Sequence, residues 1–278
     1  MEFTAVSWNL FHGRDFPPDP TLFTWRSRLL GTEERGETHV QVNRELADEF
    51  GAMLAGAGWD IALLQECPPR FAAPLAAACG AEGHRVLTSR NSLSALRSFI
   101  ARRNPDLIAS GEGGSNLTLV RGGRIVGRGE TTIHEGRPER RAMALTRTGD
   151  GLCIANLHAT NDRPLLAAVD VLRGAEAAVE WAGDSPLIFG GDLNLRPGED
   201  PEVFEALGAR FGLTGPTHPD MIDHILTRGC EIVRQPRPWP APEREVSHNG
   251  LRLRLSDHAP LQGRFKIASG GGLRAGVR

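Results

Sequence analysis

The sequence of 278 residues contains no tyrosine, a single lysine and only four cysteines, and no apolar run approaches the roughly 18 residues of a membrane-spanning helix. Without tyrosine, every mechanism that needs a tyrosine hydroxyl is excluded. The cysteines form no C-x-x-C pair, which predicts reduced thiols near a core rather than a disulfide framework or a zinc site. The N-terminus is too acidic, and its apolar stretch too short, for a signal peptide. We therefore expect a cytoplasmic protein without a membrane span.

Neither sign of charge is in large excess, because the formal net charge is only −2. No overall positive field therefore attracts the protein to nucleic acid, although a local basic patch or a bound cation can serve the same purpose. With 40% hydrophobic and 24% charged residues, the composition is that of a globular protein. It excludes a disordered chain, a collagen-like repeat or a coiled coil as a description of the whole.

Short apolar runs that fit strands alternate with stretches that have a helical period of apolar residues. We expect strands at 3–8, 59–64, 84–88, 106–110, 117–120, 124–133, 142–146, 152–157, 187–189, 222–226 and 259–267. We expect helices at 40–54, 68–79, 93–100, 165–181 and 202–207. Glycines at 122–123 and 149–151 favour hairpins between the flanking strands. Helices between strands, together with hairpins, predict mixed sheets whose two faces must be covered.

No linker divides the chain. The proline-rich stretch 236–242 has the composition of one, but only about 35 residues follow it, too few for a second domain. We therefore expect a single domain over residues 1–267, followed by a glycine-rich, disordered tail over residues 268–278. The segments 14–38, 89–115 and 236–255 are interpreted as loops that set specificity.

Polar side chains stand where several of the apolar runs begin or end. They are Asn9, Gln65 and Glu66, His158, Asp192 and Asn194, Asp223, and Asp257 and His258. Sites form where strand ends converge on one edge of a sheet, and carboxylates gathered there raise one another's pKa unless a cation joins them. Three or four carboxylates with amides and imidazoles, and no thiolate, describe an oxygen-rich site for Mg²⁺ or Mn²⁺.

The same residues resemble the motifs of the endonuclease/exonuclease/phosphatase superfamily, whose fold is DNase I-like. The resemblance covers residues 8 to 260 and rests on Trp8-Asn9, Gln65-Glu66, Asn156-Leu157-His158, Gly191-Asp192-Leu193-Asn194, Ile222-Asp223-His224-Ile225 and Ser256-Asp257-His258-Ala259-Pro260. It implies an α/β protein built as a four-layer α/β/β/α sandwich, in which helices flank two mixed sheets. The separate expectation of mixed sheets without a linker agrees with this.

The resemblance also implies a role for each matching residue. Glu66 would be the principal Mg²⁺ (or Mn²⁺) ligand, with Asn9 nearby and Asp257 completing the coordination directly or through water. Asp192 would position and deprotonate the attacking water, and Asn194 would orient that water or the phosphate.

Imidazoles and an arginine would serve the substrate phosphate. The resemblance implies that His258, held by Asp223, contacts a non-bridging oxygen as an imidazolium. His158 would donate a proton to the leaving oxygen or stabilise the transition state. Arg141 is the best candidate for an arginine on the phosphate, with Arg140 as the alternative.

Some positions depart from the pattern or lie outside it. Phe11 stands where abasic-site endonucleases of this group carry an acid, and those enzymes also use a tyrosine. The histidine at position 158, in a motif where those enzymes have none, makes the chain more similar to the deoxyribonuclease, sphingomyelinase and toxin branches. Asn116 is a further candidate for the substrate phosphate, with an ordinary turn residue as the alternative. His12 and Asp15 follow the first motif closely without a role in the pattern.

Phosphoester hydrolysis needs an attacking water, a cation at the phosphate oxygens and a proton for the leaving group, and the motifs offer a candidate for each. We therefore expect a monomeric Mg²⁺- or Mn²⁺-dependent phosphodiesterase, with DNA or RNA as the first candidate substrate. One alternative is a phosphomonoesterase for a small or lipid-head phosphate, favoured by the near-neutral charge and the few aromatics (6%). The other is a phosphate-binding module without catalysis, against which the acid–base residues argue.

Overall fold

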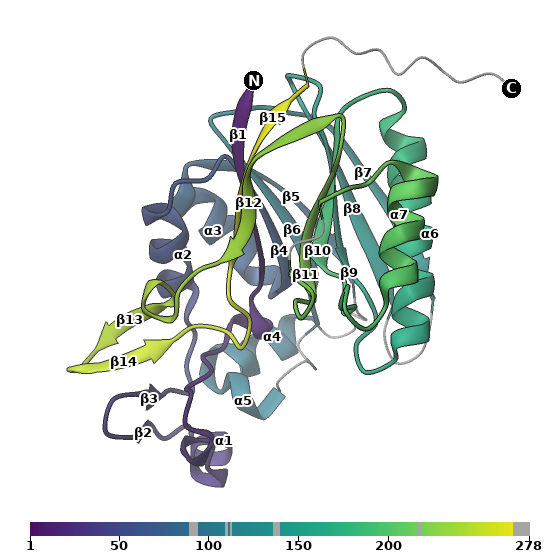
Figure 1. The fold of residues 1–278 in the computed structure, drawn as a ribbon. Helices are drawn as coiled ribbons and strands as arrows, with labels where there is room; N and C mark the ends of the chain where they lie inside the picture. The colour runs from purple at the N-terminus through teal and green to yellow at the C-terminus, as the bar shows by residue number, and fades with distance from the viewer. Residues whose placement is uncertain (89–93, 109–110, 112, 136–139, 216–217, 269–278) are drawn as a thin grey trace, which may run out of the picture.

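In the computed structural model, two β-sheets pack face to face and helices cover their outer faces (Figure 1). The structure describes residues 1–88, 94–108, 111, 113–135, 140–215 and 218–268. The predicted four-layer α/β/β/α sandwich of two mixed sheets is confirmed. The tail expected to be disordered lies outside the described residues, apart from its first residue. Within the described part of the chain, none of the helices combines the length and the apolar character that crossing a bilayer requires.

The first sheet has six strands, with the N-terminal strand in its interior. Its order is β12 (Cys230–Pro238), β15 (Leu261–Ile267), β1 (Glu2–Asn9), β4 (Ile61–Cys67), β6 (Ser115–Arg121) and β5 (Ala81–Leu87). Strand β1 runs parallel to β4 and antiparallel to β15, so the sheet is mixed.

The second sheet has five strands. Its order is β11 (Asp223–Arg228), β10 (Leu187–Asp192), β9 (Cys153–His158), β8 (Arg141–Thr148) and β7 (Ile125–His134). Strands β9 and β10 are parallel, whereas the other pairs are antiparallel. The expected hairpin around residues 149–151 is confirmed, because it joins β8 to β9.

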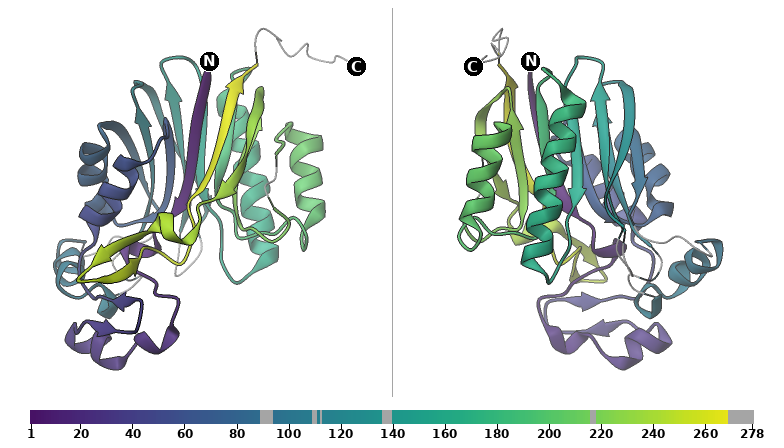
Figure 2. Two further views of the ribbon diagram at one scale, coloured as in Figure 1. Left: turned by 60° about the vertical axis from the view of Figure 1, so that its left-hand side comes forward. Right: turned by 90° about the vertical axis from the view of Figure 1, so that its right-hand side faces the viewer.

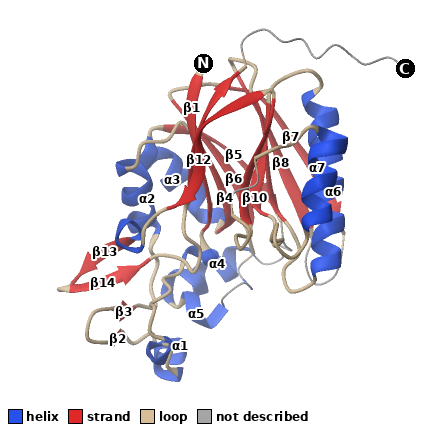
Figure 3. Ribbon diagram, in the orientation of Figure 1, coloured by secondary structure: helices blue, strands red, loops and turns tan. Residues whose placement is uncertain are grey.

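Helices lie against both outer faces of the sandwich, as Figures 2 and 3 show. Helices α2 (Ala47–Gly56) and α3 (Ala72–Cys79) lie on the first sheet, and α6 (Pro164–Ala182) and α7 (Pro201–Phe211) lie on the second. Each pair closes a core of its own, and a third core fills the space between the sheets. The chain can therefore bury apolar side chains on both faces of both sheets.

Strand alternation decides which side chains face the space between the sheets. In β1, Val6 and Trp8 pack in the core under α2 and α3, whereas Phe3 and Ala5 pack in the core between the sheets. Successive side chains of a strand point to opposite faces, so Asn9 shares the inner face with Phe3 and Ala5. The inner face thus changes from apolar to polar at the end of the strand.

Short elements gather at the end of the sandwich where β1, β4, β9 and β10 end (Figure 1). They are η1 (Phe11–Gly13), η2 (Pro20–Leu22), α1 (Trp25–Leu30), β2 (Glu34–Arg35), β3 (Val40–Gln41), α4 (Ser94–Arg103), α5 (Pro105–Ile108), η5 (Ala241–Arg244), β13 (Glu245–His248) and β14 (Leu251–Arg254). A further short turn, η3 (Pro69–Phe71), precedes α3. Most of these elements belong to the segments interpreted as specificity loops.

The hairpin expected around residues 122–123 is wrong. The strands that flank these glycines, β6 and β7, belong to different sheets. Both edges of β6 are already paired, with β4 on one side and β5 on the other, so no edge remains for β7. Strand β7 pairs with β8 instead, and the connection crosses from one sheet to the other.

The strand expected at residues 106–110 is also wrong, since the described part of that stretch lies in helix α5. The helix begins at Pro105, and the side chain of Asn104 accepts a hydrogen bond from the backbone N of Leu107 at 2.9 Å. An N-capping asparagine followed by proline is a helix-start signal that the short apolar run concealed. Residues 109–110 lie outside the described residues.

Two other segments depart from the expected pattern. The helix expected at 40–54 begins only at Ala47, because Val40–Gln41 pair with Glu34–Arg35. The proline-rich stretch 236–242 is partly strand, since β12 continues to Pro238 along the edge of the first sheet. Proline is tolerated on an edge strand, and register shifts interrupt the pairing of β12 with β15.

The carboxyl group of Asp15, which is 1% exposed, makes stability depend on pH. Burial raises its pKa from 3.8 to about 8, and the nearby charge of Asp106 adds to the shift. Between these values the folded protein keeps a proton that the unfolded chain releases, so stability falls as pH rises from about 4 to about 8. We expect Asp15→Asn to remove this dependence, because asparagine does not titrate. The variant should still fold, since asparagine offers the oxygen that accepts from Val42 N.

Urea denaturation of both proteins at pH 5 and pH 8 measures the effect. The variant should gain about 4 kcal/mol of stability relative to the wild type between these two values, at 1.36 kcal/mol per pH unit. Exposed Asp19, whose pKa is lowered by its bonds to Thr21, gives the control Asp19→Asn, which should not show this gain. Parallel pH profiles for Asp15→Asn and the wild type would contradict the prediction.

Candidate active site

Three of the predicted site residues lie side by side at the end of the second sheet. Asp192 ends β10 and is the register partner of His158, which ends the parallel strand β9. On its other side, Asp192 is the register partner of Asp223, the first residue of the antiparallel strand β11. Partners in register point to the same face of a sheet, so the three side chains form one row.

The first sheet contributes Asn9 and Glu66 from the ends of β1 and β4. Asn9 donates a hydrogen bond from Nδ2 to Oδ2 of Asp192 at 2.9 Å, which joins the two sheets. Alternation alone would turn Glu66 to the outer face, but a bulge interrupts the pairing of β4 with β6, and Glu66 has a φ of 46°. The bulge re-aims the side chain, and its Oε1 lies 3.7 Å from Nε2 of His158.

The loop between β14 and β15 brings Asp257 and His258 to the same place. Oγ of Ser256 donates to the carbonyl oxygen of Asn9 at 2.6 Å and accepts from the backbone N of His258 at 3.0 Å. Nε1 of Trp8 donates to the carbonyl oxygen of His258 at 3.0 Å. The serine of the Ser-Asp-His motif therefore holds the loop against the end of β1.

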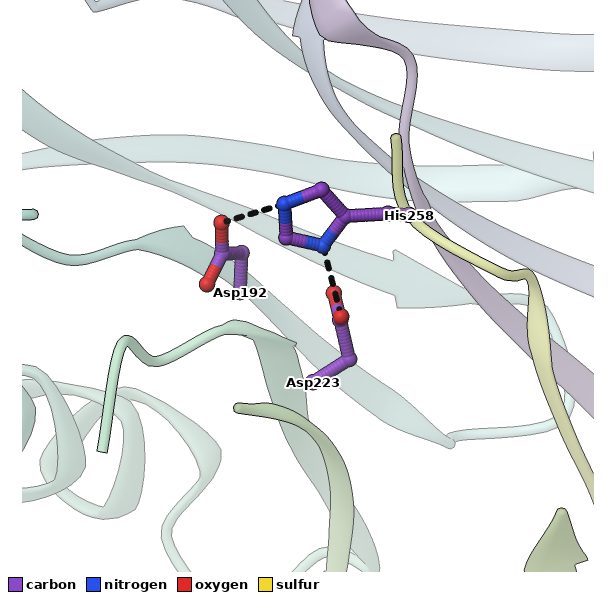
Figure 4. A group of neighbouring side chains, drawn as sticks. All are labelled: Asp192, Asp223 and His258. Atoms are coloured by element: carbon purple, nitrogen blue, oxygen red, sulfur yellow. Dashed lines mark hydrogen bonds and ion pairs between the residues drawn. The ribbon is translucent and has the colours of Figure 1, made fainter. Parts of the chain in front are cut away.

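Both ring nitrogens of His258 face carboxylates, as Figure 4 shows. Nδ1 lies 2.7 Å from Oδ2 of Asp223, and Nε2 lies 3.8 Å from Oδ2 of Asp192. Burial opposes the charged form, but the two carboxylates outweigh it and raise the pKa of His258 well above its ordinary value. His258 is therefore an imidazolium at neutral pH, oriented by Asp223.

Asp192 is held by two N–H donors. Oδ2 accepts from Asn9, and Oδ1 accepts from the backbone N of Asn194 at 3.1 Å. Burial raises the pKa of Asp192 to about 7, with further increases from neighbouring carboxylates, although the charge of His258 and the bond from Asn9 oppose the shift. A carboxylate with this pKa can exchange a proton near neutral pH.

His158 is held as a neutral ring by Arg141. Nη1 of Arg141 lies 3.3 Å from Nδ1 of His158, and only a nitrogen without a proton can accept from a guanidinium. Burial lowers the pKa of His158 to about 3, and the charge of Arg141 lowers it further while Glu66 opposes. The remaining proton is therefore on Nε2, which lies 3.5 Å from Oδ2 of Asp192.

Glu66 is ionised at every working pH. Burial favours its neutral form, but interactions with the imidazoles of His12 and His158 and a bond from Asn9 lower the pKa of Glu66 to about 2. Burial raises the pKa of Asp257, and the negative charge of Glu66 raises it further. The two carboxylates are thus close enough to repel each other, as a pair of ligands for one cation would.

Asn116, unlike the other candidate site residues, is fully buried between the two sheets. It is 0% exposed, and its Nδ2 donates to the carbonyl oxygens of Ala142 and Asn156. Nε2 of Gln65 donates to Oδ1 of Asn156 at 2.8 Å, so the three amides cross-link the sheets beneath the site. Their place in the structure is that of a buried polar network between the sheets rather than a surface for the substrate.

Most of the strained backbone in the described residues surrounds this site. Seven non-glycine residues have positive φ, and five of them carry or adjoin the groups described above: Phe11, His12, Glu66, Asn194 and Ser256. Such conformations cost on the order of 1–3 kcal/mol each and persist where the surrounding structure enforces them. Their concentration here indicates a functional site.

The comparison with known families agrees with this geometry. The model of the Endonuclease/Exonuclease/phosphatase family matches residues 6–258. The chain belongs to this family. Its members are phosphoester hydrolases, and the matched region contains the predicted site residues from Asn9 to His258. No curated protein sequence matches the chain.

Solved structures share the fold at low sequence identity. An endonuclease/exonuclease/phosphatase from Bacteroides vulgatus is 14% identical with a TM-score of 0.61, covering 96% of this chain and 99% of that chain. The mannosyl-6-phosphatase Bt3783 of Bacteroides thetaiotaomicron is 14% identical with a TM-score of 0.57, covering 95% and 99%. TDP2 of Caenorhabditis elegans is 15% identical with a TM-score of 0.55, covering 96% and 74%.

Members of the family generally use divalent metals, and the donor set of this chain fits one. Burial raises the pKa of Asp192 and of Asp257, and the negative charge of Glu66 adds to both shifts, which is the state that a bound cation relieves. Oxygen donors of this kind suit Mg²⁺ or Mn²⁺. The set Asp192, Asp223 and His258 also has its ligand atoms within 4.8 Å of one another. The His258 ring could ligate a cation only after losing its proton.

His12 is the site residue that the family pattern left without a role. Its Nε2 lies 3.1 Å from Oε2 of Glu66, and its Nδ1 is buried without a hydrogen-bond partner among the described residues. His12 and His158 therefore each lie near one oxygen of the Glu66 carboxylate. The only signal in the sequence was its position three residues after Asn9.

Proposed function

We propose that the chain is a divalent-metal-dependent phosphodiester hydrolase. The observation that carries the proposal is His258, an imidazolium oriented by Asp223 and set beside a carboxylate, Asp192, with a pKa of about 7 (Figure 4). The first group offers positive charge to a phosphate oxygen, and the second accepts a proton from water. A module that only binds phosphate needs no such base.

The metal would be held by Glu66, with Asn9 and Asp257 beside it. When bound, Mg²⁺ or Mn²⁺ would neutralise charge on the phosphate oxygens. Because the pKa of Glu66 is about 2, this ligand has no proton to release before it binds a cation. Its low pKa therefore favours metal binding over a wide pH range.

Asp192 is the proposed base for the attacking water. The N–H donors of Asn9 and Asn194 fix the plane of its carboxylate, so one oxygen lone pair can be aimed at the water. Asn194, whose positive φ places it against Asp192, is the proposed positioning residue for the water or the phosphate.

His258 would bind a non-bridging oxygen, and His158 would stabilise the transition state. With a pKa of about 3, His158 does not persist as an imidazolium at neutral pH, so we favour hydrogen-bond donation from Nε2–H over proton transfer to the leaving group. Arg141 fixes this tautomer and places its own charge beside the phosphate.

Acidic groups outnumber basic ones at the site, which favours a diester over a monoester. Four carboxylates, those of Glu66, Asp192, Asp223 and Asp257, face the cations of His258 and Arg141. A diester brings one negative charge, whereas a monoester brings nearly two at pH 7 and needs more positive charge than His258, Arg141 and a bound divalent cation supply against four carboxylates. A phosphomonoesterase remains the second candidate, because the structural relatives include a mannosyl-6-phosphatase. DNA and RNA are candidate diesters.

With Mg²⁺ or Mn²⁺, the purified protein is expected to hydrolyse bis-p-nitrophenyl phosphate faster than p-nitrophenyl phosphate. EDTA should abolish this hydrolysis. Glu66→Gln keeps the shape of the side chain but removes its charge, so calorimetry should show Mn²⁺ affinity reduced at least about 10-fold. Glu130→Gln, a change on the exposed face of β7, should leave both measurements unaltered. Faster monoester hydrolysis would favour the phosphatase, and full activity in EDTA would refute the metal dependence.

A further inference from the structure

Eight of the thirteen large apolar side chains that the described residues expose lie on one lobe at the site end of the sandwich. We call residues 16–30 and 94–108 the helical lobe, since they contain α1, α4 and α5 (Figure 1). The eight are Phe16, Phe23, Trp25, Leu29, Leu30, Leu96, Phe99 and Leu107, and Trp25 and Leu30 are 64% and 66% exposed. Scattered apolar residues are ordinary on a surface, but a concentration of this kind marks an interaction site.

The helical lobe is continuous with the active site. A row of aromatic contacts leads from the site turn into the lobe, with Phe11 and Phe16 at 5.6 Å and Phe16 and Phe23 at 5.4 Å between ring centroids. The backbone N of Ser256 donates to the carbonyl oxygen of Arg14 at 3.1 Å. The guanidinium of Arg14 lies over the ring of Phe11.

A cavity of about 510 Å³ opens between α1 and α5 on this path. Its walls include Arg14 and Arg28 together with the rings of Phe23 and Trp25. The cavity therefore offers both cationic and apolar surface next to the loop that carries Asp257 and His258.

Arginine predominates among the charged residues of the helical lobe, whose acids are Asp19 and Asp106. The sequences of α1, WRSRLL, and of α4, SALRSFIARR, hold five arginines and no Asp or Glu, in a chain whose net charge is −2. The acid of α5, Asp106, lies 3.6 Å from Arg14. The guanidinium of Arg103 lies 4.1 Å from the ring centroid of Phe99, so charge and apolar surface are presented together.

We propose that the helical lobe docks on an anionic phospholipid surface and thereby presents a lipid phosphodiester to the active site. Exposed Trp, Phe and Leu side chains enter the boundary between headgroups and acyl chains, while arginines bind lipid phosphates. The proposed docking depends only on the observations about the helical lobe. The choice of a lipid as substrate rests in addition on the proposed phosphodiesterase activity.

Other occupants fit the lobe less well. A second copy would bring five arginines of α1 and α4 against the same five, and like charges repel across a self-complementary interface. Single-stranded nucleic acid would use the arginines and the aromatic rings, but Leu29, Leu30, Leu96 and Leu107 have no ring face on which a base can stack. Aliphatic side chains next to arginine suit acyl chains beneath phosphates.

Vesicle co-sedimentation of the full-length protein tests the docking. The wild type should bind vesicles of phosphatidylcholine containing phosphatidylglycerol, bind phosphatidylcholine alone more weakly, and detach as salt is raised. The triple variant Trp25→Ser/Leu29→Ser/Leu30→Ser and the double variant Arg26→Gln/Arg28→Gln should each bind at least about 10-fold more weakly. Leu165→Ser, which changes an 85% exposed leucine outside the lobe, is the matched control and should bind like the wild type.

The same proteins separate docking from catalysis. Both lobe variants should hydrolyse soluble bis-p-nitrophenyl phosphate at the wild-type rate, and that unchanged rate also shows that they fold. They should lose at least about 10-fold in rate on a phosphodiester lipid embedded in the anionic vesicles. Inactivity of the wild type on every diester, with vesicle binding that depends on the lobe, would reject the proposed function and retain the docking.

Three results would overturn the docking. They are absence of wild-type binding to the anionic vesicles, binding by the lobe variants equal to that of the wild type, and a sedimentation equilibrium dimer that the triple variant abolishes. Lobe-dependent binding of single-stranded DNA without vesicle binding would assign the lobe to nucleic acid instead.

Discussion

Replacing Asp192 by asparagine is expected to lower kcat for bis-p-nitrophenyl phosphate by about 10³-fold at saturating Mn²⁺. Asparagine keeps one of the two acceptor oxygens, so it retains one of the two bonds that hold this position, but it cannot accept a proton from water. Because the carboxylate is 2% exposed and its pKa is raised to about 7, losing its charge should not unfold the protein. Steady-state kinetics and a urea denaturation curve measure the two quantities.

The control for this experiment is Asp60→Asn. Asp60 precedes β4 at the opposite end of the sandwich, where it accepts from the backbone N of Thr4 at 2.7 Å. It should leave kcat within about two-fold of the wild-type value. A rate for Asp192→Asn within 10-fold of the wild type, with the fold intact, would remove Asp192 from the role of base.

The second large effect is expected for Gly191→Ala, which should cost more than about 4 kcal/mol of stability. A Cβ atom at this position would lie 1.9 Å from the carbonyl oxygen of Leu157, at the place where β9 pairs with β10. The φ of Gly191 is 129°, which side chains of L-amino acids rarely adopt. Either β10 moves away from β9 or the backbone changes, and both displace Asp192.

Chemical denaturation measures the loss, and the yield of folded protein gives the same information if the variant does not accumulate. Gly56→Ala is the matched control, because the added Cβ meets no atom within 4 Å at the end of α2. It should be neutral or slightly stabilising, by a few tenths of a kcal/mol. A Gly191→Ala protein with wild-type stability and activity would show that the pairing of β9 with β10 tolerates a displacement of this size.

Strand periodicity made much of the fold and part of the site predictable. Apolar runs that end in polar residues located β1, β4, β9 and β10, and a period of two places Asn9 on the inner face. The order of the motifs then indicated the sandwich. Glu66 could not be oriented in this way, because its direction depends on a bulge that no local residue announces.

The sequence could not decide between pairing partners that fit its pattern equally well. The glycines at 122–123 suit a hairpin as well as a crossover, and only the occupied edges of β6 exclude the hairpin. The position of His12 near Asn9 did not reveal its contact with Glu66, because that contact joins residues 54 positions apart through two strained turns. Within the helical lobe, the helix expected at 93–100 overlaps α4, whereas α1 lies in a segment interpreted as a loop, since its exposed leucines follow no period that distinguishes a surface from a core.

The groups around Asp192 come from both sheets, since β1, β4 and the loop before β15 face β9, β10 and β11 across the central core. Neither layer alone contains a working set of groups. Hydrolysis regained after dilution from denaturant would therefore require both sheets to form and pack together, and it should lag behind the recovery of β-structure seen by circular dichroism. Two separately expressed fragments divided between β7 and β8 should each be inert and should become active when mixed.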